Sequence, residues 1–347
     1  MKKYFKFCLL LFIFSLEFSL FAQNLSLLDH AKKDGMTLYW DSLSETGMLE
    51  KNGHQFSFRK DEPVAILDSY RIILTDAPIL KENQILVTQK FLDDANYFFN
   101  QDSDVMFKVG AILIDAGHGG KDPGACQTWK INGKNVTIRE KDITLKVCKM
   151  LYERLKIAYP DKKIIMTRDT DKFLSLVERT DIANSVQVDS DEATLYISVH
   201  VNSSLNKNAS GYEVWYLSPG YRRTVIDESV AEGDETLLPI LNSMLEEEYT
   251  KESIMIAEFI MDGMQAQIGT QSKARGIKEE EWFVVKNSNM PAVLIELGFL
   301  SNYNEAILLN NDKYLKKATL GIYNGIAAFI THFERSRGFT STKWKFK

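Results

Sequence analysis

Residues 112–125 read ILIDAGHGGKDPGA, where an apolar run ends at an aspartate and a histidine follows among glycines. The run has the length and apolar content of a strand buried on both faces. Similar continuous runs occur in TLYISVH, residues 194–200, and AVLIEL, residues 292–297. Helical patterns alternate with these runs over residues 109–338. This alternation predicts an α/β domain with a mixed, mostly parallel sheet that helices cover on both faces.

Three chemically active side chains stand at the ends of these runs. His118 follows the first run, His200 closes the second and Glu296 lies near the end of the third. Ligands of open α/β sheets bind outside the carboxyl ends of the strands, so these side chains are candidates for one site. A solvated histidine on a glycine-rich turn is the simpler alternative for His118. The chain has 5 histidines, and two of them at strand ends of one domain favour a metal site.

A fourth candidate is Glu140, which begins the helical pattern EKDITLKVCKMLYERL. An acidic residue in the first turn of a helix also complements the helix dipole, so this position alone does not assign a role. The sequence contains no HExxH motif. A metal in this domain would therefore need ligands from separate segments.

The sequence begins with MKKYFKFCLLLFIFSLEFSLFAQ, where lysines precede a Leu/Phe run that leads to Ala22. This layout is typical of a secretory signal peptide over residues 1–22 and predicts export to the periplasm or cell envelope. A short buried helix and an uncleaved anchor are the alternatives. Glu17 interrupts the run, and a membrane-spanning helix needs about 20 apolar residues, so we expect no stable transmembrane segment after cleavage.

Residues 23–108 lack long helical periodicity and contain short β-rich pieces such as HQFSF, PVAIL, YRIILT and QILVTQKF. They predict a small, mostly β N-terminal domain that serves as a stalk or binds the wall or a partner. The formal net charge of −5 provides no general basic surface, so we expect no nucleic-acid partner. Cys126 and Cys148 lie beyond the signal peptide, and export allows either a disulfide between them or two free thiols.

A series of short motifs runs through the second part of the chain. They read AGHGGKDPGA, RE, TRDTDKFLSLVERTDIAN, SVHVNSS and PAVLIELGFLSN, and they begin at residues 116, 139, 167, 198 and 291. Each motif alone is common. In this order, over residues 109–335, they resemble the zinc-dependent N-acetylmuramoyl-L-alanine amidases of bacterial cell-wall turnover.

The resemblance implies one zinc ion per catalytic domain, held by His118, Glu140 and His200, with Glu296 as the catalytic glutamate. Two imidazoles and one carboxylate leave zinc an open position for water, so these residue types suit a hydrolase. The implied substrate is peptidoglycan. The implied reaction is hydrolysis of the amide bond between N-acetylmuramic acid and L-alanine, which releases stem peptides from glycan strands.

Other polar residues are given supporting roles. Arg168, Asp171 and Arg179 lie in the long third motif, where we expect a buried Arg–Asp network that braces the sheet edge. Three further residues are expected to support the ligands or to touch the substrate: Asp115, Asn202 and Arg275. The alternatives are a turn-forming role for Asn202 and a plain surface charge for Arg275. Arg275 precedes WFVVK, residues 282–286, which we interpret as a strand.

An insertion over about residues 218–250 separates the strand pattern GYEVWYL from the helix pattern SIMIAEFIMDGM. Some division-associated members of the resembled family carry a helix here that covers the zinc until an activator protein displaces it. One carboxylate of three would then occupy the open zinc position: Glu246, Glu247 or Glu248. A solvated helix at the rim of the site is the alternative.

Two rival functions stand beside the amidase. One is another zinc amide hydrolase, such as a peptidase or a sugar deacetylase, which product analysis would separate. The other is a catalytically inactive peptidoglycan-binding or scaffold protein, which would be expected to lack a ligand or the catalytic glutamate. All four of these positions carry the required residue types here, which favours the enzyme.

Overall fold

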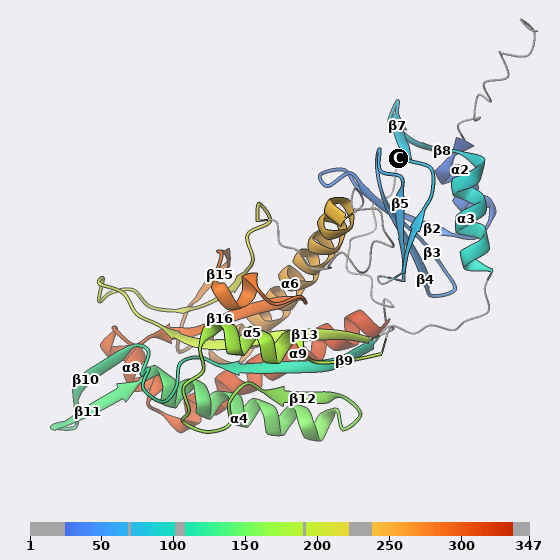
Figure 1. Ribbon diagram of the computed structural model, residues 1–347. Coiled ribbons are helices and arrows are strands. Elements are labelled where there is room, and N and C mark those ends of the chain that lie inside the picture. Colours follow the sequence, from blue (N-terminus) through green and yellow to red (C-terminus); the bar gives the residue numbers. More distant parts are fainter. Residues whose placement is uncertain (1–24, 69–70, 101–107, 190–191, 222–237, 336–347) are drawn as a thin grey trace, which may run out of the picture. The chain divides into compact units, whose positions relative to one another are not determined.

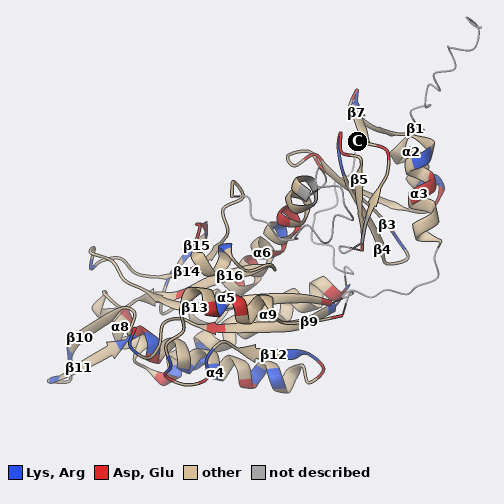
Figure 2. Ribbon diagram, in the orientation of Figure 1, with Lys and Arg blue, Asp and Glu red and all other residues tan. Residues whose placement is uncertain are grey.

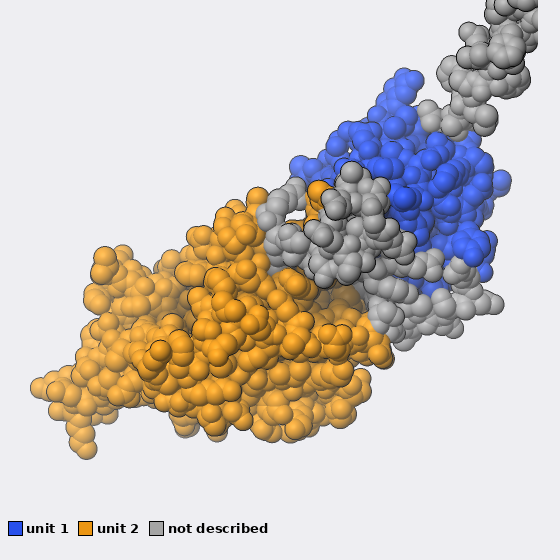
Figure 3. Space-filling model, viewed as in Figure 1, with its two compact units in different colours: residues 1–103 blue, residues 104–347 orange. Residues whose placement is uncertain are grey.

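The computed structural model describes residues 25–68, 71–100, 108–189, 192–221 and 238–335. The chain divides into two compact units, residues 1–103 and 104–347, which Figure 3 colours separately. Each unit has a hydrophobic core of its own. The signal peptide expected over residues 1–22 lies outside the described residues, and so do residues 222–237 of the expected insertion.

The described residues of the first unit form two antiparallel sheets and two helices (Figure 1). One sheet has the order β2-β3-β4-β5-β6, formed by Thr37–Asp41, Thr46–Lys51, His54–Arg59, Val64–Leu67 and Arg71–Leu74. The other has the order β1-β8-β7, formed by Leu25–Ser26, Gln84–Val87 and Ile79–Lys81. The helices are α2, Leu27–Lys33, and α3, Gln89–Phe99. The aromatic rings of Phe56 and Phe58 each meet Phe91 of α3 edge to face, so this helix is part of the core.

The stretch QILVTQKF, expected to be one β-rich piece, contains the whole strand β8 and the start of a helix. The strand β8 ends at Val87, and α3 begins at Gln89. Between them, the Thr88 hydroxyl accepts the backbone N–H of Phe91, which caps the helix. The helix buries residues three and four positions apart, a spacing that the short apolar pieces conceal.

A six-stranded, mostly parallel sheet forms the centre of the second unit, as the sequence predicts. Its order is β12-β9-β13-β16-β14-β15, formed by Lys163–Met166, Lys108–Ala116, Glu192–Asn202, Ala292–Phe299, Tyr212–Tyr216 and Ala274–Glu279. The first four strands in this order are parallel, whereas β14 is antiparallel to β16 and parallel to β15. The central strands β9, β13 and β16 are mostly buried, which explains their continuous apolar runs.

Helices cover both faces of this sheet (Figure 1). The larger core contains side chains from α4, Glu140–Ala158, α6, Leu238–Ile268, and α9, Asp312–Arg335. The core on the other face contains side chains from α5, Leu176–Asn184, and α7, Phe283–Lys286. The helix α8, Tyr303–Leu309, follows β16, and a separate hairpin is formed by β10, Cys126–Ile131, and β11, Lys134–Arg139.

The structure corrects the expected strand at WFVVK and shows the state of the two cysteines. The stretch WFVVK is a helical turn, α7, and not a strand, because an apolar run this short has no period that separates the two structures. Cys126 is exposed at the start of β10, Cys148 is buried in α4, and both thiols are free. Within the described residues, no helix combines the length and the apolar character needed to cross a membrane.

Candidate metal centre

His118 lies directly after β9 in a left-handed backbone conformation, with a φ of 60°. Few residues other than glycine adopt this conformation, so the surrounding turn must hold it. Gly119 and Asp122 close that turn with two backbone hydrogen bonds. The Asp122 carboxylate also accepts a hydrogen bond from Nδ1 of His118 at 2.7 Å. This contact orients the ring so that Nε2 faces Glu140.

Two glycines of the same motif make room for the candidate ligands. A Cβ at Gly124 would lie 2.5 Å from Oε2 of Glu140 and 2.6 Å from Cδ2 of His118. A Cβ at Gly117 would collide with the ring of His200. The loop, the helix start and the strand end can therefore converge only where these two positions carry no side chain.

Glu140 is the buried first residue of α4. Its carboxylate accepts backbone N–H groups from Ala125 at 2.8 Å and from Val201 at 2.9 Å. Its Oε1 also lies 3.1 Å from Nε2 of His118 and 3.0 Å from Nδ1 of His200. Burial raises the pKa of Glu140, but the hydrogen bonds from both histidines outweigh burial and hold this pKa well below its usual range. The carboxylate thus stays charged at the point where a cation would bind.

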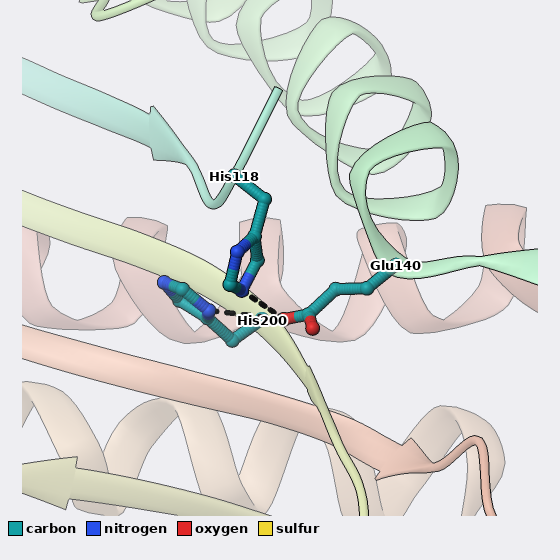
Figure 4. Close-up of side chains that lie close together, drawn as sticks. All are labelled: His118, Glu140 and His200. Carbon is teal, nitrogen blue, oxygen red and sulfur yellow. Dashed lines mark hydrogen bonds and ion pairs between the residues drawn. The ribbon is translucent and has the colours of Figure 1, made fainter. Parts of the chain in front are cut away.

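His118, Glu140 and His200 meet at one point, although they come from three separate segments (Figure 4). One ligand atom from each lies within 4.8 Å of the others, and the two imidazole rings are 5.1 Å apart. The structure therefore brings together the three residues that the sequence motifs predict. Two nitrogen donors and one charged oxygen donor fit a metal ion that accepts imidazole and carboxylate ligands.

Glu296 lies on β16 beside this group. It is in register with His200 on one neighbouring strand and with Glu213 on the other. Its side chain is buried, and its Oε2 has no hydrogen-bond partner among the described residues. Burial raises the pKa of Glu296 well above its usual value, and the charges of Glu140 and Glu213 add to this effect. A buried carboxyl group with an unused oxygen beside a candidate metal site is a candidate for proton transfer.

Two buried arginines hold the backbone that leads to His118. Arg179 donates to the carbonyl of His118 at 2.6 Å, to the carbonyl of Ala116 at 2.7 Å and to the Asp115 carboxylate at 2.6 Å. Arg168 donates from Nε to Ala116 and from Nη2 to Gly117, each at 2.8 Å. The two guanidinium groups thus clamp the carbonyls of residues 116–118.

The carboxylate of this Arg–Asp network is Asp115 and not Asp171, which corrects the expectation. Asp115 also accepts hydrogen bonds from Thr167 and Ser198. Burial raises its pKa, but Arg179 and these hydroxyls bring the net shift below the usual value. Asp171 instead lies at the surface, where it accepts from Lys141 and from the backbone of the loop. Asp115 therefore supports the His118 loop from beneath.

Asn202 and Arg275 converge on one buried carboxylate, Glu213. Asn202 donates to its Oε1 at 2.7 Å, Arg275 donates to its Oε2 at 2.6 Å, and Lys278 donates to the same oxygen. Two of the three residues expected to support ligands or touch substrate thus hold the neighbour of Glu296. Sequence reasoning missed Glu213 because only the pairing of β14 with β16 places it there. It also missed Asp122. The available signal was its position, four residues after His118 in a glycine-rich turn.

Glu246, Glu247 and Glu248, one of which is expected to reach the metal site, lie on α6. The hydroxyl of Ser253 on α6 accepts the backbone N–H of Ala292, the first residue of β16, while Gln265 meets Tyr212 at the other end of the sheet. The three glutamates precede Ser253 by five to seven residues, roughly 8–10 Å along the helix. They therefore lie beyond the end of β16 that is opposite the metal site.

Comparison with known proteins gives a family and several relatives. The family profile described as N-acetylmuramoyl-L-alanine amidase, Amidase_3, matches residues 112–328. YqiI of Bacillus subtilis (strain 168), described as an uncharacterized protein, is 33% identical over 218 residues, which cover 63% of this chain and 84% of that protein. The endolysin of Bacillus phage SPP1 is 32% identical over 232 residues, which cover 67% of this chain and 70% of the endolysin. An N-acetylmuramoyl-L-alanine amidase from Clostridium difficile 630, known from a crystal structure, is 26% identical with a TM-score of 0.47, covering 65% of this chain and 98% of that one.

Proposed function

The chain belongs to the Amidase_3 family of N-acetylmuramoyl-L-alanine amidases, and we propose that it cleaves peptidoglycan with one zinc ion bound by His118, Glu140 and His200. The observation that carries this proposal is the convergence of these three residues beside the buried carboxyl group of Glu296. The donor set of two imidazoles and one carboxylate is one that zinc accepts in hydrolases while keeping a further position open.

Each site residue has a task in the proposed hydrolysis. Zinc, when bound, lowers the pKa of water and polarises the amide carbonyl. Glu296 takes a proton from the attacking water and delivers it to the nitrogen of L-alanine as the carbon–nitrogen bond breaks. A cation held next to it would lower the raised pKa of Glu296 toward the range that a general base needs. The products are a lactyl carboxylate on the glycan and a stem peptide with a free amine.

Supporting residues keep these groups in place. Asp122 orients His118 through Nδ1, and Arg179 fixes the backbone that carries His118. Arg275 forms an ion pair with Glu213 and Asn202 donates a hydrogen bond to its other oxygen, so that this carboxylate is held in place next to Glu296. We therefore assign Asn202 and Arg275 to the support of Glu296 rather than to direct substrate contact.

The remaining parts of the chain carry roles that follow from this activity. Residues 1–22 direct export, since peptidoglycan lies outside the cytoplasmic membrane. Residues 23–108 serve as a stalk or as a wall- or partner-binding domain, and residues 109–338 form the catalytic domain. An activator protein can act on the insertion at 218–250 only if the insertion restrains activity. Deletion of residues 225–248 tests for this restraint. A rise in basal activity would support an autoinhibitory insertion, and unchanged activity of a folded protein would exclude it.

The decisive experiment compares the protein without residues 1–22 with its Glu296→Gln variant on purified peptidoglycan. Mass spectrometry should detect stem peptides with an L-alanine amino terminus, and a chelator should abolish them. We expect Glu296→Gln to slow release by about 10²- to 10⁴-fold. Glu153→Gln, at an exposed position of α4, is the matched control. Zinc-loaded wild-type protein that binds peptidoglycan without releasing peptides would instead support the scaffold alternative.

A further inference from the structure

Trp282 is a large aromatic side chain exposed beside the catalytic face of the sheet. Its exposed fraction is 41%. It occupies the N-cap position of α7, yet its side chain makes no capping hydrogen bond. Helix starts favour Ser, Thr, Asp or Asn at this position, so the tryptophan does not contribute to helix stability there. Its ring is available for another contact.

The ring of Trp282 lies close to the strand that neighbours Glu296. It packs against Trp215 with a centroid distance of 5.9 Å and an angle of 90°. Trp215 is two residues beyond Glu213 on β14, so both side chains point to the same face of the sheet, about 7 Å apart along the strand. Because Glu213 is in register with Glu296 and Trp215 with Leu294, the aromatic pair lies two residues from the level of Glu296, toward the start of β16.

The rings of Trp215 and Trp282 differ in their accessibility to a ligand. Lys278 lies over the ring of Trp215, with its Nζ 4.9 Å from the ring centroid. Trp215 is half-buried and packs against the core on that face of the sheet. Trp215 therefore acts as the support, and Trp282 presents the accessible aromatic surface.

Charged side chains of both signs surround Trp282 and the His118 loop. The residues that lead into Trp282 are Glu279, Glu280 and Glu281, all exposed, and Figure 2 shows this acidic run beside β15. On the other flank, exposed lysines adjoin the His118 loop, at positions 121 and 172. Lys286 pairs with Glu281 at 3.2 Å and Lys141 pairs with Asp171 at 2.7 Å. Net charge therefore does not distinguish the two sides, and the Trp282 side is characterised by its packed aromatic pair.

We propose that Trp282, supported by Trp215, is a stacking platform for the pyranose rings of the glycan strand next to the cleaved bond. The carbon–hydrogen face of a pyranose is apolar and packs on an aromatic ring. This inference rests on the proposed function and assigns the glycan strand to the Trp282 side of the site.

The first test compares two substrates of the zinc-loaded protein: long glycan strands with stem peptides, and a muramoyl peptide with a single sugar. In Trp282→Ala we expect the ratio of kcat/KM for the strands to kcat/KM for the small substrate to fall roughly 3- to 10-fold. Trp282→Phe should retain most of the ratio. Phe173→Ala removes an aromatic ring of similar exposure, 40%, from the other flank and should leave the ratio unchanged. An unchanged ratio in Trp282→Ala would overturn the platform.

A second test measures binding without hydrolysis, so that it stands if the protein cleaves neither substrate. An oligomer of N-acetylglucosamine, which is neutral and has no stem peptide, is titrated calorimetrically into wild-type protein and into Trp282→Ala. Weaker binding to the variant supports the platform. Equal binding to both proteins, or no binding to wild type, contradicts it. If wild-type protein cleaves neither substrate but binds the oligomer, and Trp282→Ala loses this binding, the amidase reaction is refuted while the sugar-binding site is supported.

Discussion

Asp122 accepts a hydrogen bond of 2.7 Å from Nδ1 of His118, while Glu140 faces the other nitrogen of the same ring. The imidazole is thus fixed between two carboxylates, one of which belongs to the candidate metal ligands. A carboxylate behind a histidine ligand sets its tautomer and strengthens it as a donor. The affinity for the metal should therefore depend on a residue that does not touch the metal.

Asp122→Asn should weaken zinc binding by about 10- to 100-fold, because the amide is a poorer acceptor for the ring N–H. Competition titration against a chelator measures the change. Asp142→Asn is the control, since Asp142 is an exposed acidic residue in the first turn of the nearby helix α4. Equal zinc affinities for wild type and Asp122→Asn would show that the hydrogen bond does not support the ligand.

Gly124→Ala should lower the affinity for zinc by more than its backbone strain alone would cause. The new Cβ would collide with both Glu140 and His118, and the residue has a φ of +63°. Gly133→Ala provides a close comparison, because its φ is +78° but no atom lies within 4 Å of the new Cβ. Both variants carry a left-handed strain of about 1–2 kcal/mol. Measured zinc affinity should separate them, and similar affinities would contradict the need for close approach.

Arg179→Met should lower the free energy of unfolding by about 3–5 kcal/mol, because it leaves the buried Asp115 carboxylate without its charged partner. It also frees the carbonyl of His118, so zinc affinity should fall as well. Urea unfolding with and without zinc measures both effects. Adding Asp115→Asn to Arg179→Met should recover part of the lost stability. If the stability losses of the two single variants simply add in the double variant, Arg179 and Asp115 do not act as a pair.

The parts of the site that sequence predicts are those held by strand ends. His118, His200 and Glu296 follow buried apolar runs, and the parallel order of β9, β13 and β16 brings those run ends together. Glu140 needed the family motif, because an acidic helix start has an ordinary explanation of its own.

The parts that sequence could not predict depend on tertiary pairing. Glu213 became a neighbour of Glu296 only through the antiparallel pairing of β14 with β16. Asp171 lies between the two arginines in the sequence whereas Asp115 lies far ahead of both, and only the folded structure shows that Asp115 is the partner of Arg179. Residue propensity and sequence spacing carry no information on the neighbour of Glu296 or on the partner of Arg179.

A final prediction concerns the pH dependence of stability and the helix α6. Glu252 is buried there, and burial, with a smaller effect from Glu248, raises its pKa well above the usual value of 4.5. Below that pH the carboxyl is protonated in both the folded and the unfolded chain. As pH rises above it, the unfolded chain releases the proton while the folded chain retains it, so the folded state loses stability.

Glu252→Gln removes this penalty, because the amide has no proton to lose. The variant should match wild type near pH 4.5 and then become the more stable protein as pH rises, by up to about 1.4 kcal/mol for each pH unit until the folded carboxyl ionises. Urea unfolding of both proteins between about pH 4.5 and pH 7 measures the difference. Glu258→Gln, exposed on the same helix, should show no such growth. A stability difference for Glu252→Gln that stays constant with pH would mean that Glu252 ionises in the folded protein much as it does in the unfolded chain.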